Sequence, residues 1–338
     1  MLLLVLAAVV FGFTKVAAMF GGPADYSGQG TGKVVVEVAN GANGQQIANV
    51  LKEAGVVKSA EAFYQVSLND PRAQSIQFGF YQLRKKMSAK AALDALVDKK
   101  NRVEGRVTIP EGARIDDIVP LIAKGSEISE KDVSSALKKP NELGLPQDAE
   151  SNPEGYLFPA TYIVQPGMSA KDLLRQMVAK TIDVSKSLDV NSRAQELGLS
   201  GAEVLTVASL LEREAQKDED FPKVARVLYN RIKADQPLQL DSTVAYVSKR
   251  EGDVFTTPEE RDNPSAYNTY KNVGLPPGPI GSPGEKTIEA ALEPAEGSWT
   301  YFVTVNLETG ETVYSENMKE HNKAVAQLQE YCKGTDLC

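Results

Sequence analysis

Residues 33 to about 180 repeat one local pattern, in which an alternating strand is followed by a turn and an amphipathic helix. The first copy is KVVVEVANGANGQQIANVLKEAGVV, and the later copies are FGFYQLRKKMSAKAALDALVDKK, GRVTIPEGARIDDIVPLIAKG and TYIVQPGMSAKDLLRQMVAK. Ser88 and Ser169 each precede apolar residues at helical spacing and are predicted helix N-caps. Because such a unit cannot bury its apolar face alone, we expect the copies to pair. This pattern predicts an α+β fold.

The first of these units, from Lys33 to about Lys124, resemble LysM-like modules. The resemblance implies binding of glycans that contain N-acetylglucosamine. The alternative is a generic small α+β unit that serves as a spacer.

The N-terminal stretch MLLLVLAAVVFGFTKVAAMF is apolar except near Lys15. It is long enough for a slightly tilted membrane span from which Lys15 can snorkel. A cleaved signal peptide is the alternative, although signal peptides usually begin with basic residues and this stretch does not. We expect an uncleaved single-pass anchor, followed by the flexible Gly-rich tether GGPADYSGQGTG. Either interpretation places the rest of the chain outside the cytoplasm.

The charge and the few soft ligands exclude some functions. With 37 basic and 45 acidic residues the net charge is -8, whereas broad nucleic-acid binding needs a basic face. A His/Cys zinc site needs three or four soft ligands, and the chain offers only His321, Cys332 and Cys338. We expect no metal and no cofactor. The two cysteines enclose the short segment CKGTDLC and could form a disulfide in an oxidising compartment; two free thiols are the alternative.

A different domain begins near Gly198. The run SGAEVLTVASLLEREAQ predicts a helix that starts with a capping box of Ser200 and Glu203. Pro222 suits the start of a second helix, which ends before Pro237. The remainder predicts short strands in WTYFVTVN and TVYS and a final helix from about Met318.

Two acids, Glu212 and Glu214, lie near the end of the first of these helices. At 100° per residue they flank the apolar stripe on opposite sides. Both therefore lie at the boundary of burial, where desolvation raises the pKa of a carboxyl group. A carboxyl that stays protonated near neutral pH is what a general acid needs for glycoside cleavage. The alternative is a solvated, ion-paired Glu-Arg-Glu edge, and the periodicity does not choose between the two acids.

Downstream segments carry polar and aromatic side chains that suit a cleft. In PLQLDSTVAY, Gln239, Asp241 and Thr243 alternate, so we expect them to project from one side of an extended segment. SAYNTYKNVGLPPGPIGSPG contains Tyr267 and Asn268 and then becomes rich in Pro and Gly. It is either a shaped binding loop or a rigid surface excursion.

The stretch NPEGYLFPATYIV mixes aromatic residues and prolines with a single acid, Glu154. Packing at a domain junction is the default interpretation. A stacking wall for sugars, which would include Tyr162, is the alternative.

An ordered set of motifs carries a specific resemblance. The motifs are ASLLEREA, VLYNRI, LQLDSTVAY, AYNTY, GLPPGPIGSPG, AALEPA, YFV and EHNKAV. From about Asn152 to Val325 they resemble the endolytic murein transglycosylases of the MltG (YceG-like) family. The resemblance implies a lytic transglycosylase that cleaves peptidoglycan glycan strands at the outer side of the cytoplasmic membrane. It also implies the bond between N-acetylmuramic acid and N-acetylglucosamine as the target, 1,6-anhydro ends as products, and action near elongating synthases, where nascent strands would be terminated or trimmed.

The resemblance also bears on residue roles. LLEREA is similar to the helix of lytic transglycosylases and lysozyme-like enzymes that carries a catalytic acid, with Glu214 in the catalytic position. Ala215 stands where those enzymes often have Ser or Thr. Glu212 would be a helper, by ion pairing or by holding a neighbouring loop. Further substrate-binding or supporting residues are expected at Gln239, Asp241, Thr243, Tyr267, Asn268, Tyr162 and His321, the last more structural than substrate-binding.

We therefore expect four regions: a transmembrane anchor (1–20), a flexible linker (21–32), LysM-like α+β units (33–124) and a mixed α/β transglycosylase domain with a lysozyme-like acid-bearing helix (125–338). Two other functions stay open at this point. One is a hydrolytic muramidase that pairs Glu214 with Asp241 and water. The other is a peptidoglycan-binding wall scaffold without catalysis.

Overall fold

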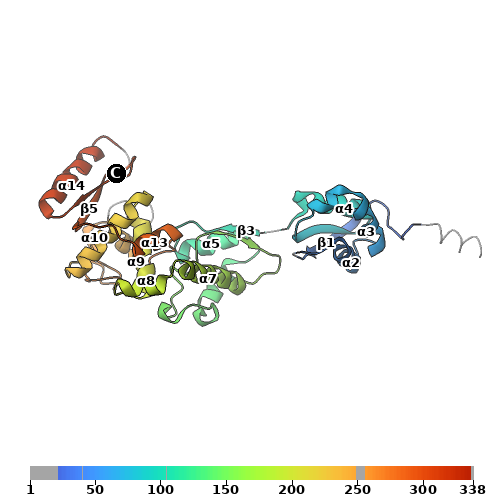
Figure 1. The fold of residues 1–338 in the computed structure, drawn as a ribbon, viewed down its shortest axis with the longest axis horizontal. Helices are drawn as coiled ribbons and strands as arrows, with labels where there is room; N and C mark the ends of the chain where they lie inside the picture. The colour runs from blue at the N-terminus through green and yellow to red at the C-terminus, as the bar shows by residue number, and fades with distance from the viewer. Residues whose placement is uncertain (1–21, 40, 104, 249–255, 336–338) are drawn as a thin grey trace, which may run out of the picture. The chain divides into compact units, whose positions relative to one another are not determined.

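The computed structural model describes residues 22–39, 41–103, 105–248 and 256–335 (Figure 1). The chain divides into two compact units. The first comprises Met1–Gly105 with Ile163–Gly167, and the second comprises Arg106–Tyr162 with Met168–Cys338. The predicted anchor over residues 1–20 lies outside the described residues. Within the described ranges, no helix is both long enough and apolar enough to cross a membrane.

The first unit folds around two antiparallel strands. Its elements are β1 (Gln29–Val38), α2 (Gly44–Glu53), α3 (Ala60–Asn69), η1 (Pro71–Ser75), β2 (Gly79–Met87), α4 (Ala89–Val97) and η2 (Lys99–Asn101). β1 pairs with β2, with Val36 opposite Tyr81. Ser88 caps α4, as predicted. The strands of the first two sequence copies thus pair, but α3 lies between them and was not predicted.

The second unit begins with the other two copies. Its first elements are β3 (Gly105–Thr108), α5 (Ile115–Gly125), α6 (Glu130–Leu137), η3 (Pro140–Glu142), η4 (Gln147–Ala149), β4 (Thr161–Val164), α7 (Ala170–Ser187) and α8 (Val190–Glu196). β3 pairs with β4, so these two copies also pair. Ser169 accepts a hydrogen bond from the Asp172 backbone and caps α7, as predicted. The compact units divide at Gly105, whereas the predicted domain boundary falls at the end of α5.

The acid-bearing helix forms the centre of the second unit. It is α9 (Gly201–Glu214), followed by η5 (Asp218–Asp220), α10 (Phe221–Lys233), α11 (Asp241–Ser248), α12 (Pro258–Arg261) and α13 (Glu285–Leu292). The capping box of Ser200 and Glu203 is present as predicted. All residues of α9 from Val204 to Leu211 are buried, and the helix packs against α8, α10, α11 and α13. Each large apolar side chain buried this way stabilises the fold by about 1.5–3 kcal/mol.

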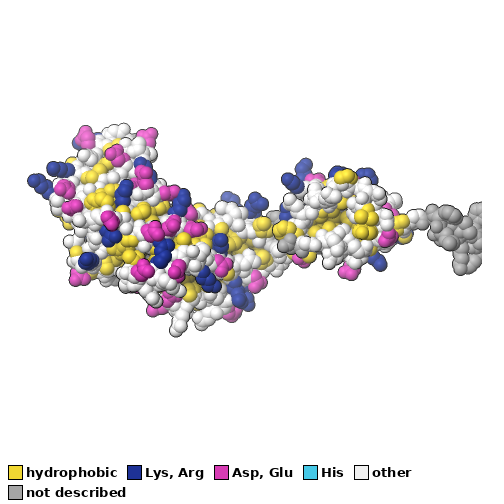
Figure 2. Space-filling model, in the orientation of Figure 1, with side chains coloured by type: hydrophobic (Ala, Val, Ile, Leu, Met, Phe, Trp, Pro, Cys, Tyr) yellow, Lys and Arg dark blue, Asp and Glu magenta, His cyan; other side chains and the backbone are white. Residues whose placement is uncertain are grey.

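The C-terminal part contains the two short strands and the final helix that were predicted. β5 (Tyr301–Asn306) pairs antiparallel with β6 (Glu311–Ser315), and α14 (Met318–Cys332) packs on β5. Cys332 is in a disulfide, and Cys338 lies outside the described residues. On the face shown in Figure 2, basic and acidic side chains are interspersed, with apolar side chains between them.

One sequence prediction about a loop is wrong, and one of two open interpretations of another loop does not fit. PLQLDSTVAY is not extended from end to end, because α11 begins at Asp241 directly after a left-handed turn at Gln239 (φ 53°). Of the two interpretations of the Pro/Gly-rich loop, the surface excursion does not fit its last part, because the run 278–284 is buried. It is fixed there by backbone hydrogen bonds that pair Ser282 with Gly112 and Ala113.

Candidate active site

Glu212 holds the start of another helix. Its Oε2 accepts hydrogen bonds from the Gly284 backbone N–H at 3.0 Å and from the Thr287 hydroxyl at 2.8 Å. Gly284 is the N-cap residue of α13 and has no side chain to cap it. Glu212, on α9, accepts instead from the N-cap backbone N–H itself, and the dipole of α13 favours a negative charge at this N-terminal end. Burial raises the pKa of Glu212, and its two hydrogen bonds oppose that effect. In this geometry Glu212 connects the end of α9 to the start of α13.

Glu214 ends α9 and faces the first turn of α11. Part of the residue stays accessible to solvent. The backbone N–H and the hydroxyl of Ser242 both favour its ionised form. The Ser242 hydroxyl is buried and reaches no partner at hydrogen-bonding geometry among the described residues, so its interaction with the carboxyl is weak. Among the described residues, Glu214 therefore has no counterpart of the two short hydrogen bonds that hold Glu212.

Opposing effects act on the proton of Glu214. Burial is the largest and raises its pKa, and the nearby Asp241 carboxylate raises it further. Ser242 and Arg213 lower it. The net pKa of Glu214 is raised, which favours the protonated form that a general acid needs.

Asp241 is the first residue of α11 and is held from several directions. It accepts hydrogen bonds from Tyr270 at 2.7 Å and from Thr256 at 2.5 Å. Arg261 forms an ion pair with it at 3.2 Å, and the guanidinium lies 4.9 Å from the centre of the Tyr270 ring. These contacts fix a negative charge beside Glu214. They also leave Asp241 little freedom to activate a water molecule.

The loop after α12 presents Tyr270 to the acid. Tyr270 interacts electrostatically with Glu214 as well as with Asp241. Asn268 is fully buried, and its amide donates to the carbonyls of Arg261 and Asn263 and accepts from the Tyr270 backbone. Asn268 thus shapes the loop that carries Tyr270.

Tyr267 takes part in a neighbouring aromatic cluster. Its ring lies 5.0 Å from that of Tyr246, and its electrostatic partner is Glu154. The resemblance pointed to Tyr267 and Asn268, but the residue of this loop that interacts with Glu214 is Tyr270. Tyr270 belongs to the same AYNTY motif, and that was the available sequence signal.

Gln239 and Thr243 attach α11 to this loop. The Gln239 backbone N–H donates to the Thr269 carbonyl at 3.0 Å, and its side chain is exposed. Thr243 is completely buried, and its hydroxyl bonds the Leu240 carbonyl and the Thr269 hydroxyl. The burial of Thr243 excludes it from contact with substrate.

Tyr162 and His321 both lie away from Glu214. Tyr162 is only 9% exposed and donates its hydroxyl to the Phe158 carbonyl, so its ring offers little surface to a sugar. His321 stacks on Tyr301 with ring centres 5.0 Å apart. Arg231 covers the same ring at 5.1 Å and interacts electrostatically with Glu214. Burial lowers the pKa of His321, and Arg231 adds to that effect. His321 thus reaches the acid only through two intervening residues.

A second buried acid was not assigned from the sequence. Glu154 is 5% exposed and accepts hydrogen bonds from the Ile115 backbone at 3.2 Å and from Tyr246 at 3.3 Å. Burial raises the pKa of Glu154 to about 7, against the hydrogen bonds and the charge of Arg114. Because Ile115 begins α5, Glu154 serves as an acceptor at the start of that helix. Within the described residues, no group of three or more His, Cys, Asp or Glu residues could hold a metal ion.

Most of both units matches a known protein family. The model of the YceG-like family matches residues 36–327. The chain belongs to the YceG-like family. The resemblance drawn from the ordered motifs is thereby confirmed.

Named relatives of this YceG-like chain come from two genera. An endolytic murein transglycosylase of Bacillus subtilis (strain 168) is 35% identical over 309 residues, which cover 86% of this chain and 83% of the relative. An endolytic murein transglycosylase of Streptococcus pneumoniae (strain R6) is 32% identical over 325 residues, which cover 87% of this chain and 58% of that longer protein.

A crystal structure of a yceG-like protein from Listeria monocytogenes matches the fold with a TM-score of 0.59 at 30% identity. The match covers 86% of this YceG-like chain and 99% of the Listeria chain. It supports the mixed α/β fold of this chain.

Proposed function

We propose that this YceG-like chain is an endolytic lytic transglycosylase of peptidoglycan and that Glu214 is its catalytic acid. It is a lyase, and its substrate class is the glycan strand of murein. Support comes from family membership and from relatives named endolytic murein transglycosylases along most of the chain.

The observation that carries the choice of Glu214 is its contrast with Glu212. Glu212 is tied to Gly284 and Thr287 at the start of α13. Glu214 faces the Ser242 backbone N–H, and burial together with Asp241 raises its pKa. A general acid must hold a proton at working pH and remain free to release it. Glu214 meets that requirement, whereas Glu212 is already committed to holding a helix.

The reaction needs one carboxyl group in two successive roles. Protonated Glu214 gives its proton to the oxygen that links N-acetylmuramic acid to N-acetylglucosamine. The bond from that oxygen to C1 of the muramic acid breaks, and positive charge develops at C1. The ionised carboxylate then takes the proton of the muramic C6 hydroxyl, whose oxygen attacks C1. The products are a 1,6-anhydro end and a free hydroxyl on the glucosamine, and no water is consumed.

The neighbours of Glu214 have matching roles. The Ser242 backbone N–H favours the carboxylate that exists between the two proton transfers. Asp241 favours the protonated form before the first transfer, and Tyr270, Thr256 and Arg261 fix its place. A hydrolytic muramidase would need a second carboxylate that is free to activate water. Asp241 is already bound by Tyr270, Thr256 and Arg261, and these contacts argue against that function.

The first unit and the N-terminal stretch complete the proposal. LysM-like glycan binding by the β1–β2 unit would hold a strand near the membrane. A membrane anchor over residues 1–20 would place the enzyme at the outer face of the cell membrane, where elongation synthases deliver nascent strands. Cells that produce a fluorescent fusion test the location, since an even cytoplasmic signal contradicts it.

Product analysis on purified glycan strands tests the central proposal. The wild type is expected to release fragments with 1,6-anhydro ends, which mass spectrometry finds lighter by one water than reducing ends. Glu214→Gln should abolish cleavage, whereas Glu212→Gln, the matched control, should retain it. Reducing ends from the wild type, or undiminished cleavage by Glu214→Gln, would contradict the proposal.

A further inference from the structure

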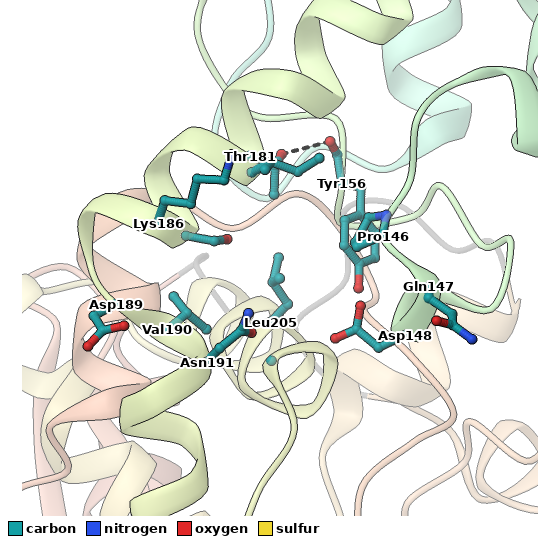
Figure 3. Close-up of a pocket in the computed structure, with 13 residues that line it drawn as sticks. Pro146, Gln147, Asp148, Tyr156, Thr181, Lys186, Asp189, Val190, Asn191 and Leu205 are labelled. Atoms are coloured by element: carbon teal, nitrogen blue, oxygen red, sulfur yellow. Dashed lines mark hydrogen bonds between the residues drawn. The ribbon is translucent and has the colours of Figure 1, made fainter.

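A cavity of about 430 Å³ lies at the far end of α9 from Glu214, between α7, α8, α9 and η4 (Figure 3). Gly201, the first residue of α9, lines it, and Glu214 is the last residue of that helix. At 1.5 Å rise per residue the two ends are about 20 Å apart. The cavity volume falls in the range of roughly 300–1,000 Å³ that small ligands occupy in proteins. The active-site geometry leaves this cavity unexplained.

Charged groups of both signs line the cavity. Figure 3 shows Asp148 on one side, and Lys186 with Asp189 on the other. The Asp189 carboxylate accepts a hydrogen bond from the Ser192 hydroxyl. Among the described residues, the side chains of Asp148, Lys186 and Asn191 have no hydrogen-bond or ion-pair partner. Val190 and Leu205 add apolar surface between the charges. Asp148, Lys186 and Asn191 are exposed, so they are open to solvent and to a ligand. The cavity thus offers an acceptor, a cation and an apolar wall.

A buried hydroxyl provides a second and independent observation. Tyr156 lines the cavity and is 2% exposed, and its hydroxyl has no hydrogen-bond partner in the described part of the chain. In Figure 3 this hydroxyl points to the Asp148 side. The Thr181 hydroxyl donates to the Tyr156 carbonyl at 2.7 Å and so fixes the residue from behind. Leaving a buried hydroxyl unpaired costs about 1–3 kcal/mol, so a ligand that pairs with it would gain from the contact.

Gly201, the first residue of α9, lets the side chains of Asn191 and Asp148 lie close to the helix. A Cβ at Gly201 would lie 2.7 Å from Asn191 Oδ1 and 3.4 Å from Asp148 Oδ2. A side chain there would displace the Asn191 oxygen and would lie in contact with the Asp148 carboxylate. The absence of a side chain at this helix position is therefore matched to the placement of the two polar groups.

We propose that this cavity binds the peptide side chain of a peptidoglycan strand, through a free ammonium group at Asp148 and a carboxylate at Lys186. This inference rests on the proposed function. Peptidoglycan peptides carry both groups, on the diamino acid and at the D-alanine end, and their methyl groups suit Val190 and Leu205. An extended peptide of five residues spans at most roughly 18 Å, which is less than the separation of the two ends of the buried helix α9. The bound peptide would therefore belong to a muramic acid further along the same strand than the one at Glu214.

Calorimetric titration of the full chain with synthetic L-Ala–γ-D-Glu–L-Lys–D-Ala–D-Ala tests the binding directly. Wild type should bind it saturably. The double variant Asp148→Asn, Lys186→Met should weaken binding by about tenfold or more, since two charge-assisted contacts are lost. Acetylating the lysine amine of the peptide should weaken binding to wild type as well. Asp183→Asn, an exposed acid of α7 outside the cavity lining, is the control and should bind like wild type. Equal binding by wild type and the double variant, or no saturable binding, overturns the proposal.

Cleavage assays separate this proposal from the proposed function. On strands that carry peptides, the double variant should show a raised KM, and on strands stripped of peptides by an amidase it should match wild type. Equal KM values for wild type and the double variant on both substrates would overturn the cavity proposal and leave the transglycosylase standing. If wild type cleaves neither substrate, the proposed function fails, and the peptide titration still decides the cavity.

Discussion

Glu214 and Ser242 meet where the last residue of α9 faces the first turn of α11. The Ser242 backbone N–H favours the carboxylate, the Ser242 hydroxyl adds a weak interaction, and burial with Asp241 favours the carboxylic acid. An acid that must give a proton and then take one back needs groups that favour its protonated form and groups that favour its ionised form. The balance between them is therefore open to test by changing one side at a time.

Removing the Ser242 hydroxyl should raise the pKa of Glu214 further. In Ser242→Ala the carboxylate loses one of the groups that favour it, so the alkaline limb of the pH profile of kcat/KM moves to higher pH. A weak hydrogen bond contributes about 1 kcal/mol or less, so the rate should change by roughly fivefold at most. Ser248→Ala, at the other end of α11, is the matched control and should leave the profile in place. A limb that moves to lower pH would contradict the assigned geometry.

Neutralising Asp241 should have the opposite effect. A nearby like charge disfavours ionisation, so Asp241→Asn should lower the pKa of Glu214 and move the alkaline limb of kcat/KM to lower pH. The same variant loses its ion pair with Arg261, and thermal melting should show whether the fold survives. A comparison at the pH optimum of each variant separates the shift in pKa from a loss of structure. An alkaline limb unchanged from wild type would show that Asp241 does not act on the acid.

Glu212 should matter for stability more than for chemistry. Glu212→Ala removes the acceptor for Gly284 and Thr287 at the start of α13, and the loss of a helix cap costs about 0.5–2 kcal/mol. Glu212→Gln keeps an acceptor oxygen at the same place and should lose less. Urea unfolding followed by circular dichroism gives the free energies of unfolding. If Glu212→Ala unfolds like wild type but no longer cleaves glycan, the roles of the two acids must be exchanged.

The contrast between these acids shows the limit of local sequence patterns. Helical spacing placed Glu212 and Glu214 on the two flanks of one apolar stripe and correctly predicted α9 with its capping box. Contacts with other helices distinguish them. The start of α13 donates hydrogen bonds to Glu212, and the start of α11 faces Glu214. No local pattern contains those contacts, and only the resemblance to a family favoured Glu214.

The same argument explains the error at α11. Gln239, Asp241 and Thr243 alternate like a strand, and Thr and Val favour strands. In the structure the left-handed turn at Gln239 and the contacts of Thr243 with the loop at Thr269 start a helix instead. Tertiary contacts therefore override a short alternating pattern. By contrast, the strands β5 and β6 and the helix α14 follow from strong local patterns, and their prediction is confirmed.

The buried acid Glu154 should make the stability of the fold depend on pH. Its pKa is about 7 in the folded chain, against an ordinary value of 4.5, so the folded state binds more protons between these values. The contribution of Glu154 to the free energy of unfolding should therefore be largest below pH 4.5 and should fall as the pH rises to about 7. At 1.36 kcal/mol per pKa unit the upper limit is about 3 kcal/mol. Glu154→Gln should remove this slope, whereas Glu127→Gln, at an exposed position, should keep it. A wild-type slope of the opposite sign that Glu154→Gln abolishes would mean that the hydrogen bonds from Ile115 and Tyr246 outweigh burial.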